Sequence, residues 1–354
     1  MMKGTMLAAH KLDALLVTHL SNVFALSGFR GTNGLVLITD KQNYLFTDPR
    51  YIEKAESVIP AGWKVIDMSA GLFDQLQTLI AKRRLKRVGF EAAQVTVAFY
   101  KRLQTLTGVT WVETMDLVEQ ERMIKDLAGR KALRLSQRLN EETLKLTLER
   151  LKAGMTESAV AWMIRCMAHD LGADDVSFPP IVAFGAHTAR PHHEPTSKKL
   201  KRGDMVLIDM GIMHRAYASD LTRTFFTKVP TAEQGDVYQT VLTAHQSAVL
   251  AVRPGAKADD IDRAARLFIS DSGYKGRFGH ATGHGIGHDV HELPRIAKGS
   301  PTPLQTGMVI AIEPGIYLPK KFGVRIEDLV EVTEQGCKSL NHLPKDLESV
   351  RIKL

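Results

Sequence analysis

The first third of the chain alternates short apolar runs with longer amphipathic ones. The short runs predict strands, because β-branched, leucine and aromatic residues bounded by polar turns fit a half-buried sheet. These runs are ALLVT (14–18), GLVLITD (34–40), NYLFTD (43–48), KVIDM (64–68), RVGFE (87–91) and TWVETM (110–115). The second and third are joined by a polar turn, which predicts a hairpin.

Three amphipathic runs between these strands predict helices. They are PRYIEKAESVI (49–59), LFDQLQTLIAKRR (72–84) and VTVAFYKRLQTL (95–106). Asp48 and Pro49 are a typical helix start, since the aspartate can cap and the proline fits the first turn. Strands alternating with helices indicate an α/β domain over residues 1–120.

Residues 121–154 are charged, helix-forming and almost free of breakers, which predicts a helical junction. Gly129 is expected to divide it into two helices and Gly154 to end the second one. Beyond it, helices are expected from Thr156 and near 231–252 and 258–272, with strand-like runs grouped between and after them. Elements grouped in this way predict an α+β domain over residues 155–354.

Composition and charge narrow the class of protein. The 354 residues are 44% hydrophobic and 24% charged, as in an ordinary globular protein, with enough chain for two domains. No apolar run approaches the ~20 residues of a membrane span, and we expect no signal peptide. Two cysteines, Cys166 and Cys337, without a CxxC pattern favour a reducing cytoplasm.

The net charge of +8 raises the question of nucleic-acid binding. The excess is spread along the chain, and its one dense run, KRRLKR (82–87), follows a predicted helix. Cations at a helix C-terminus favour the helix dipole, and no nucleic-acid-binding motif accompanies them. We therefore expect no nucleic-acid partner.

The segment HATGHGIGHDVHELP (280–294) concentrates four of the 13 histidines. Their spacing would align them on one helix face, but each of the three glycines between them would cost a helix about 1 kcal/mol. We therefore expect extended or looped backbone, with glycines where something approaches closely. The four histidines then point in different directions: His280, His284, His288 and His291.

Four acids lie in or directly after apolar, strand-like runs, namely Asp209 after MVLI, Asp220 in YASDLTRTFF, Glu313 after VIAI and Glu327 in GVRIEDLVEV. A hairpin would bring the two aspartates face to face, although Asp209 by itself is also typical of a turn. Arg325 would share a strand face with Glu327, where a salt bridge is the simpler interpretation. Carboxylates left unpaired in an apolar setting are costly, and cations between them relieve that cost.

Four carboxylates and one histidine are mostly oxygen ligands, which suit Mn²⁺ or Co²⁺ better than structural zinc. Four acids also exceed the needs of one ion, so two ions sharing bridging carboxylates, about 3.5–4 Å apart, are expected. The segment FPPIVAFGAHTARPHHEPT (178–196) is predicted to be a proline-stiffened loop. A histidine there (His187, His192 or His193) can donate a hydrogen bond to a substrate carbonyl, although each taken singly is also a typical surface residue.

Several motifs taken together resemble one enzyme family. They are PHHEPT, GDMVLIDMG, YASDLTRTF, HATGHGIGHDVHELPRI, IEPGIY and GVRIEDLVEVTEQG. In this order they resemble the pita-bread metallopeptidases, which include Xaa-Pro dipeptidase (prolidase), aminopeptidase P and methionine aminopeptidase. YLFTDPRYIEKA is similar to the creatinase/prolidase N-terminal domain, which methionine aminopeptidases generally lack. The resemblance implies a pita-bread catalytic domain.

The resemblance also implies the metal ligands. Asp209 would chelate one ion, Asp220 and Glu327 would bridge two, and His284 and Glu313 would complete the other. The cofactors would be two divalent ions, Mn²⁺ or Co²⁺, with Zn²⁺ as an alternative.

The same resemblance implies the remaining site residues. His192 and His291 would bind the substrate and the reaction intermediate, and Glu313 would also carry a proton during catalysis. His280 and Arg325 would lie next to the site.

The implied reaction is hydrolysis of the peptide bond before proline. GHGIGHDVHELPRI is closer to prolidases, since aminopeptidase P tends to have Asp where this chain has Glu292. We therefore expect a dipeptidase, with aminopeptidase P acting on longer peptides as the alternative. A non-catalytic binding module of the same fold is a third hypothesis, which the complete ligand set disfavours. The family also implies a homodimer, and no membrane partner is expected.

Overall fold

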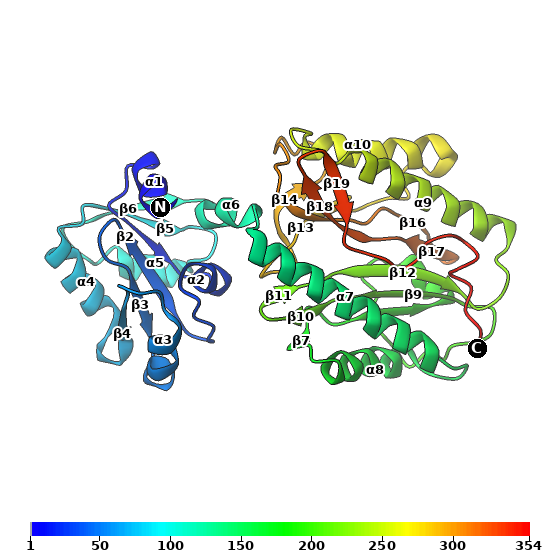
Figure 1. Ribbon diagram of the computed structural model, residues 1–354, viewed down its shortest axis with the longest axis horizontal. Coiled ribbons are helices and arrows are strands. Elements are labelled where there is room, and N and C mark those ends of the chain that lie inside the picture. The colour runs from blue at the N-terminus through cyan, green and yellow to red at the C-terminus, as the bar shows by residue number, and fades with distance from the viewer. Residues whose placement is uncertain (1) are drawn as a thin grey trace. The chain divides into compact units, whose positions relative to one another are not determined.

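The computed structural model describes residues 2–354, with side chains from residue 6 onward (Figure 1). The chain divides into two compact units, residues 1–121 and 122–354. No helix within the described residues is long and apolar enough to cross a membrane. Cys166 and Cys337 are both free thiols.

The first unit is built on one six-stranded sheet, in the order β4-β3-β2-β1-β5-β6. Its strands are β1 (Ala14–Val17), β2 (Leu35–Thr39), β3 (Tyr44–Thr47), β4 (Lys64–Asp67), β5 (Arg87–Glu91) and β6 (Thr110–Thr114). All six strands were predicted, and the predicted hairpin is the antiparallel pair β2–β3. The helices are α1 (Met2–Ala9), α2 (Leu20–Ser27), α3 (Ile52–Val58), α4 (Leu72–Arg83), α5 (Val97–Leu103) and α6 (Leu117–Met123), which runs into the second unit.

Helices cover both faces of this sheet, because its central strand is apolar on both sides. Alternate residues of β1 enter different cores, with Leu16 in one and Leu15 in the other. The helices α4 and α5 pack into the first core, and α1, α2 and α3 into the second. Of these, α1 and α2 were not predicted, although both are longer than the predicted α3 and α5. The basic run after α4 lies at its C-terminus, as expected.

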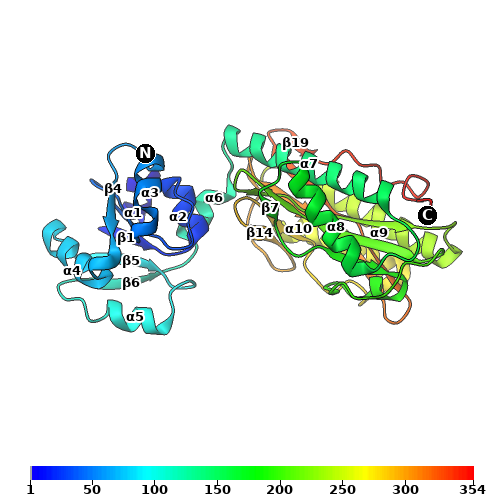
Figure 2. The ribbon, with the colours of Figure 1, turned by 90° about the horizontal axis from the view of Figure 1, so that it is seen from below.

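The strands of the second unit lie between two pairs of helices, α7 with α8 and α9 with α10 (Figures 1 and 2). The helices are α7 (Leu127–Arg150), α8 (Glu157–Asp170), α9 (Ala232–Ala251) and α10 (Ala258–Ile269). The strands are β7 (Asp175–Val176), β8 (Ile181–Phe184), β9 (Met205–Met210), β10 (Ile212–His214), β11 (Tyr217–Ala218), β12 (Leu221–Phe226), β13 (Gly283–Gly285), β14 (Glu292–Ile296), β15 (Val309–Ile312), β16 (Gly315–Leu318), β17 (Phe322–Arg325), β18 (Asp328–Thr333) and β19 (Gly336–Ser339). They form sheets β11-β10-β7, β12-β9-β8, β14-β13-β15-β18-β19 and β16-β17.

Two sequence predictions about the helical junction are wrong. The break between helices falls before Asp126, whose carboxylate accepts a hydrogen bond from the Gly129 backbone N–H and so caps α7. Gly129 therefore belongs to the first turn of α7, where a glycine costs little because the cap holds the turn. The same helix ends at Arg150, and Gly154, with a φ of 89°, belongs to the turn that follows.

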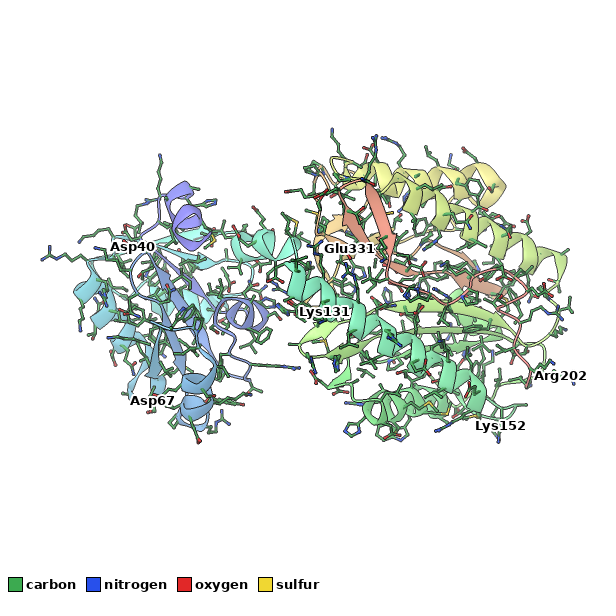
Figure 3. All side chains as sticks on the ribbon, viewed as in Figure 1. Asp40, Asp67, Lys131, Lys152, Arg202 and Glu331 are labelled. Carbon is green, nitrogen blue, oxygen red and sulfur yellow. The ribbon has the colours of Figure 1, made fainter. Side chains whose placement is uncertain are left out.

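A buried carboxylate joins α7 to the five-stranded sheet. Glu331 of β18, labelled in Figure 3, accepts hydrogen bonds from Arg130 and Arg134 of α7. Its side chain is only 3% exposed, so the pair of guanidinium groups supplies the charge that burial of a carboxylate requires.

Candidate metal centre

Two of the candidate acids lie at one end of the β9–β12 pair. Asp209 belongs to β9, and Asp220 directly precedes β12. Residue Thr222, and not Asp220, lies directly across from Asp209 in the register, so the predicted face-to-face arrangement is offset by two residues. The side chains still interact, because residues two apart in a strand point to the same side.

The other two acids follow β15 and β17. Glu313 directly follows β15, as its apolar run predicted. Glu327, expected within a strand, lies instead in the two-residue connection between β17 and β18. There its Oε2 accepts a hydrogen bond of 2.8 Å from Thr222. The expected pairing of Arg325 with Glu327 gives way to a bond between Arg325 and Asp209, 2.5 Å long.

His284 of β13 joins these acids from a third direction. Its Nε2 lies 3.5 Å from Asp220 Oδ2 and 3.7 Å from Glu313 Oε1. Its Nδ1 lies 3.0 Å from the carbonyl oxygen of Gly285, which can only accept, so Nδ1 carries the proton. Burial lowers the pKa of His284 to about 4, and the neutral ring therefore turns the lone pair of Nε2 toward the acids.

The close approach expected at the glycines around His284 is made by neighbouring backbone. A side chain on Gly283 would collide with the carbonyl group of Ala311, and one on Gly285 with that of Leu293. These carbonyl groups belong to the neighbouring chain segments. The backbone is extended at β13, as the glycine content predicted, and the glycines allow tight packing on both sides of His284.

Burial and mutual repulsion raise the pKa of three carboxyl groups in the cluster. The pKa of Asp220 lies well above its ordinary value, because the group is buried and faces the other carboxylates, Glu327 foremost. Burial likewise raises the pKa of Glu313 to about 8, with a contribution from Asp209. The pKa of Glu327 is raised for the same two reasons.

The donor set fits divalent cations. Two buried carboxylate oxygens, Asp209 Oδ1 and Glu327 Oε1, have no hydrogen-bond partner in the structure. Ligand atoms of Asp220, His284 and Glu327 all lie within 4.8 Å of one another, close enough to contact one ion. Unpaired buried oxygens and repelling carboxylates are costly, and positive charge placed between them removes both costs.

Arg325 and Tyr317 connect this cluster to its surroundings. Tyr317 accepts a hydrogen bond of 2.8 Å from Arg325 Nη1, and its hydroxyl oxygen lies 2.9 Å from His280 Nε2. His280 Nδ1 lies 4.0 Å from Glu313 Oε2. His280 and Arg325 therefore border the acids, as expected, whereas Tyr317 was missed because a tyrosine after IEPGI looks like an ordinary strand residue.

The remaining candidate histidines differ in how exposed they are to solvent. His192 and His291 are exposed, and each lies close enough to the cluster to act electrostatically on its neighbours. The ring of His291 packs edge-on against that of His284, with centroids 4.4 Å apart. His193 is buried and faces Glu157, while His288 faces the carbonyl oxygen of Ala216, away from the acids.

Charged residues outside the motifs hold the loop that carries His291. Glu292, whose side chain is 6% exposed, forms ion pairs with Arg122 and Lys125. Arg122 also pairs with Asp289 at 2.8 Å. Neither ion pair was predicted, because Glu292 lies more than 160 residues from both cations along the chain.

The sequence matches the pattern of metallopeptidase family M24 over residues 131–334 and that of the creatinase/prolidase N-terminal domain over residues 5–124. The chain belongs to metallopeptidase family M24, with the pita-bread fold in its second unit. Members of this family act with divalent metal. The metallopeptidase and fold predictions are thus confirmed.

Particular relatives resemble the chain over nearly its whole length. It is 33% identical to a Xaa-Pro dipeptidase from Pyrococcus horikoshii, covering 96% of this chain and 95% of that protein. The structure of a Xaa-Pro dipeptidase from Bacillus anthracis superposes with a TM-score of 0.94 at 31% identity, covering 98% of both chains. An X-Pro aminopeptidase from Thermotoga maritima gives a TM-score of 0.89 at 32% identity, covering 97% of this chain and 99% of that one.

The raised pKa of Glu313 predicts how pH affects the metal-free protein. Unfolding returns this pKa from about 8 to its ordinary 4.5, so between these values the folded state binds more protons than the unfolded state. Stability therefore falls as the pH rises, by about 1 kcal/mol from pH 7 to pH 8 for Glu313 alone. Urea unfolding of chelator-treated protein at both values measures the loss.

Two comparisons test this prediction. Glu313→Gln cannot ionise and should flatten the pH dependence, and added Mn²⁺ should remove it by favouring the ionised acids. A metal-free protein that is equally stable or more stable at pH 8 would contradict the prediction.

Proposed function

We propose that the chain is a Xaa-Pro dipeptidase, which hydrolyses the peptide bond between the first residue of a dipeptide and proline. The observation that carries the proposal is the acid–histidine cluster, in which the five ligand candidates interact and the exposed His291 packs against His284. Near-full-length similarity to Xaa-Pro dipeptidases supports the substrate class. Proline lacks the N–H that many peptidases require, which explains the use of a dedicated enzyme.

We propose two divalent ions, Mn²⁺ or Co²⁺, held by Asp209, Asp220, His284, Glu313 and Glu327. Oxygen-rich ligand sets favour these ions, and four carboxylates offer more negative charge than one ion needs. When bound, such ions polarise the scissile carbonyl and lower the pKa of water toward neutrality.

The chain's own residues supply positioning and proton transfer. His192 and His291, which are both exposed, are the proposed hydrogen-bond donors to the substrate carbonyl oxygen. The proposal is supported by the electrostatic interaction of His291 with Asp209 and with His192. Glu313 borders both His280 and His284 and is the proposed proton carrier. Arg325 keeps Asp209 oriented through its hydrogen bond and Tyr317 braces the guanidinium.

The alternative is an aminopeptidase that removes the first residue from longer peptides, favoured by the similarity to the Thermotoga maritima enzyme. We expect Ala-Pro to be hydrolysed with a higher kcat/KM than Ala-Pro-Ala. Steady-state kinetics with both peptides, in the presence of Mn²⁺, measure the ratio. Faster cleavage of Ala-Pro-Ala would assign the chain to the aminopeptidases.

We further propose a homodimer that works in a reducing cytoplasm. The free thiols of Cys166 and Cys337 are consistent with such a compartment. Sedimentation of the purified protein determines the oligomer. A non-catalytic binding role would require the purified protein to lack both bound divalent metal and peptidase activity.

A further inference from the structure

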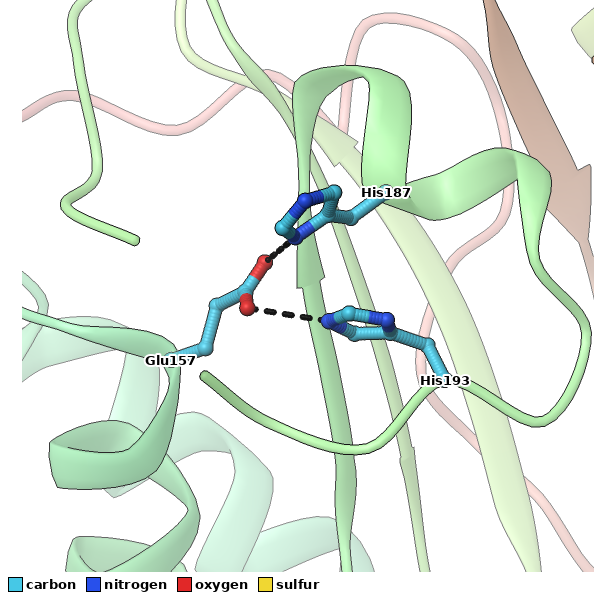
Figure 4. Close-up of side chains that lie close together, drawn as sticks. All are labelled: Glu157, His187 and His193. Atoms are coloured by element: carbon cyan, nitrogen blue, oxygen red, sulfur yellow. Dashed lines mark hydrogen bonds and ion pairs between the residues drawn. The ribbon is translucent and has the colours of Figure 1, made fainter. Parts of the chain in front are cut away.

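Glu157, at the start of α8, forms a hydrogen-bonded cluster apart from the metal centre. Its side chain is fully buried, and Figure 4 shows His187 and His193 converging on its two oxygens. Oε1 lies 2.9 Å from the Phe184 backbone nitrogen and 2.8 Å from His187 Nδ1. Oε2 lies 2.9 Å from His193 Nε2, 3.0 Å from the Thr196 nitrogen and 2.6 Å from its hydroxyl.

Two histidines and a glutamate are also a typical zinc-binding set, but the contacts here favour hydrogen bonding. An ionised carboxylate has about four lone-pair positions, and five donors already surround this one. Three of these five donors belong to Phe184 and Thr196. They would remain bonded to the carboxylate even if a metal ion took the place of the two histidine protons. Burial acts to raise the pKa of Glu157, yet the bonds from His193 and Thr196 prevail and hold it at about 2.

The segment held by Glu157 carries His192. Both His193, directly after His192, and Thr196, four residues after it, donate to the same carboxylate oxygen. These bonds tie down the C-terminal side of His192. His193 is buried, whereas His192, the residue directly before it, is exposed.

The N-terminal side of His192 is tied to the metal centre. Pro191 accepts a hydrogen bond of 3.3 Å from Arg325 Nη1 through its carbonyl oxygen. The same guanidinium donates to Asp209 through Nη2. The segment around His192 is therefore held at both ends. Arg325 holds it on the N-terminal side through Pro191, and Glu157 holds it on the C-terminal side through His193 and Thr196.

We propose that Glu157 is a positioning residue, which sets the place of His192 through the hydrogen bonds of its carboxylate to His193 and Thr196. The inference rests on the proposed function, because it assigns His192 to the substrate carbonyl. Misplacing a group that contacts the reacting carbonyl by about 1 Å can cost ~100-fold in turnover. Glu157 touches none of the five proposed metal ligands, so metal content should not change.

The test uses paired substitutions on the two histidines. His193→Leu removes the donor nearest His192, and we expect kcat for Ala-Pro to fall ~10- to 100-fold at unchanged metal content. His193→Gln keeps an N–H at the position of Nε2 and should restore most of the activity. His187→Leu removes a donor from the same carboxylate on the far side of Pro191 and should cost at most about 3-fold, well below the loss expected for His193→Leu.

A double-mutant cycle separates positioning from general destabilisation. If Glu157 acts through His192, then His193→Leu should cost nothing further in a His192→Ala background. Equal losses in both backgrounds would overturn the proposal. So would a bound third metal ion that is lost in both His187→Leu and His193→Leu, since the cluster would then be a metal site.

Crystal structures of the variants give a readout that does not depend on the substrate. We expect the His192 ring to be displaced in His193→Leu and unmoved in His187→Leu. An unmoved ring in His193→Leu would overturn the positioning role, whatever the enzyme cleaves. If instead the wild-type protein fails to cleave Ala-Pro, the proposed function fails, and the displaced ring still supports the role of Glu157.

Discussion

Replacing Asp220 by alanine should lower kcat/KM for Ala-Pro at least ~1,000-fold and remove bound divalent metal. The side chain is 7% exposed, lies 3.5 Å from His284 Nε2 and faces three further carboxylates. Metal ions in such sites contribute several kcal/mol to the transition state, and about 4 kcal/mol corresponds to a factor of 10³. Peptidase kinetics together with elemental analysis of the purified variant measure both effects.

The matched control is Asp271→Ala, which removes an exposed aspartate from the segment after α10. It should retain both activity and metal. An Asp220→Ala protein that keeps full activity would show that peptide hydrolysis does not depend on this cluster. If the Asp220→Ala protein instead keeps its metal but loses activity, Asp220 takes part in the reaction and is not needed to bind the metal.

The largest loss of stability is expected for Asp328→Ala. Asp328 is buried and accepts hydrogen bonds of 2.7 Å from Arg223 and 2.6 Å from Lys345. Alanine would leave the Arg223 guanidinium, itself 1% exposed, without its carboxylate. Breaking a buried ion pair on one side costs about 3–5 kcal/mol. Urea unfolding, followed by a probe in the second unit, measures the change.

An exposed ion pair provides the control for this prediction. Asp175 lies 3.0 Å from Arg165, and both side chains are 51% exposed. Asp175→Ala should therefore cost less than about 1 kcal/mol. If Asp328→Ala costs no more than Asp175→Ala, the buried guanidinium is compensated elsewhere and the argument from burial is wrong.

Local sequence patterns were sufficient to predict most strands and helices of the first unit. Each predicted strand combined apolar residues with polar ends, and β1 is apolar on every residue because the sheet is covered on both faces. The turn between β2 and β3 lies within a local hairpin, so it too could be predicted. The helices α1 and α2 were not predicted, although the shorter helices α3 and α5 were.

The junction shows how a local signal can mislead. Gly129 looks like a helix breaker, yet the cap from Asp126 precedes it by three residues and holds the first turn. The neighbouring Arg122 and Lys125 belong to the charged helical junction in the sequence, but they are buried against Glu292 in the structure. Their partner lies more than 160 residues away along the chain, so no local pattern could indicate the pairing.

The sequence by itself determined the kind of chemistry available. Four acids after apolar runs and a glycine-framed histidine indicated a cation site, because buried carboxylates require compensating charge. Tertiary structure decided which groups meet. It placed Glu327 between strands, turned Arg325 toward Asp209 and separated His193, held by Glu157, from the exposed His192. These outcomes depend on contacts between distant segments, whose distances and charges exist only once the sheets have paired.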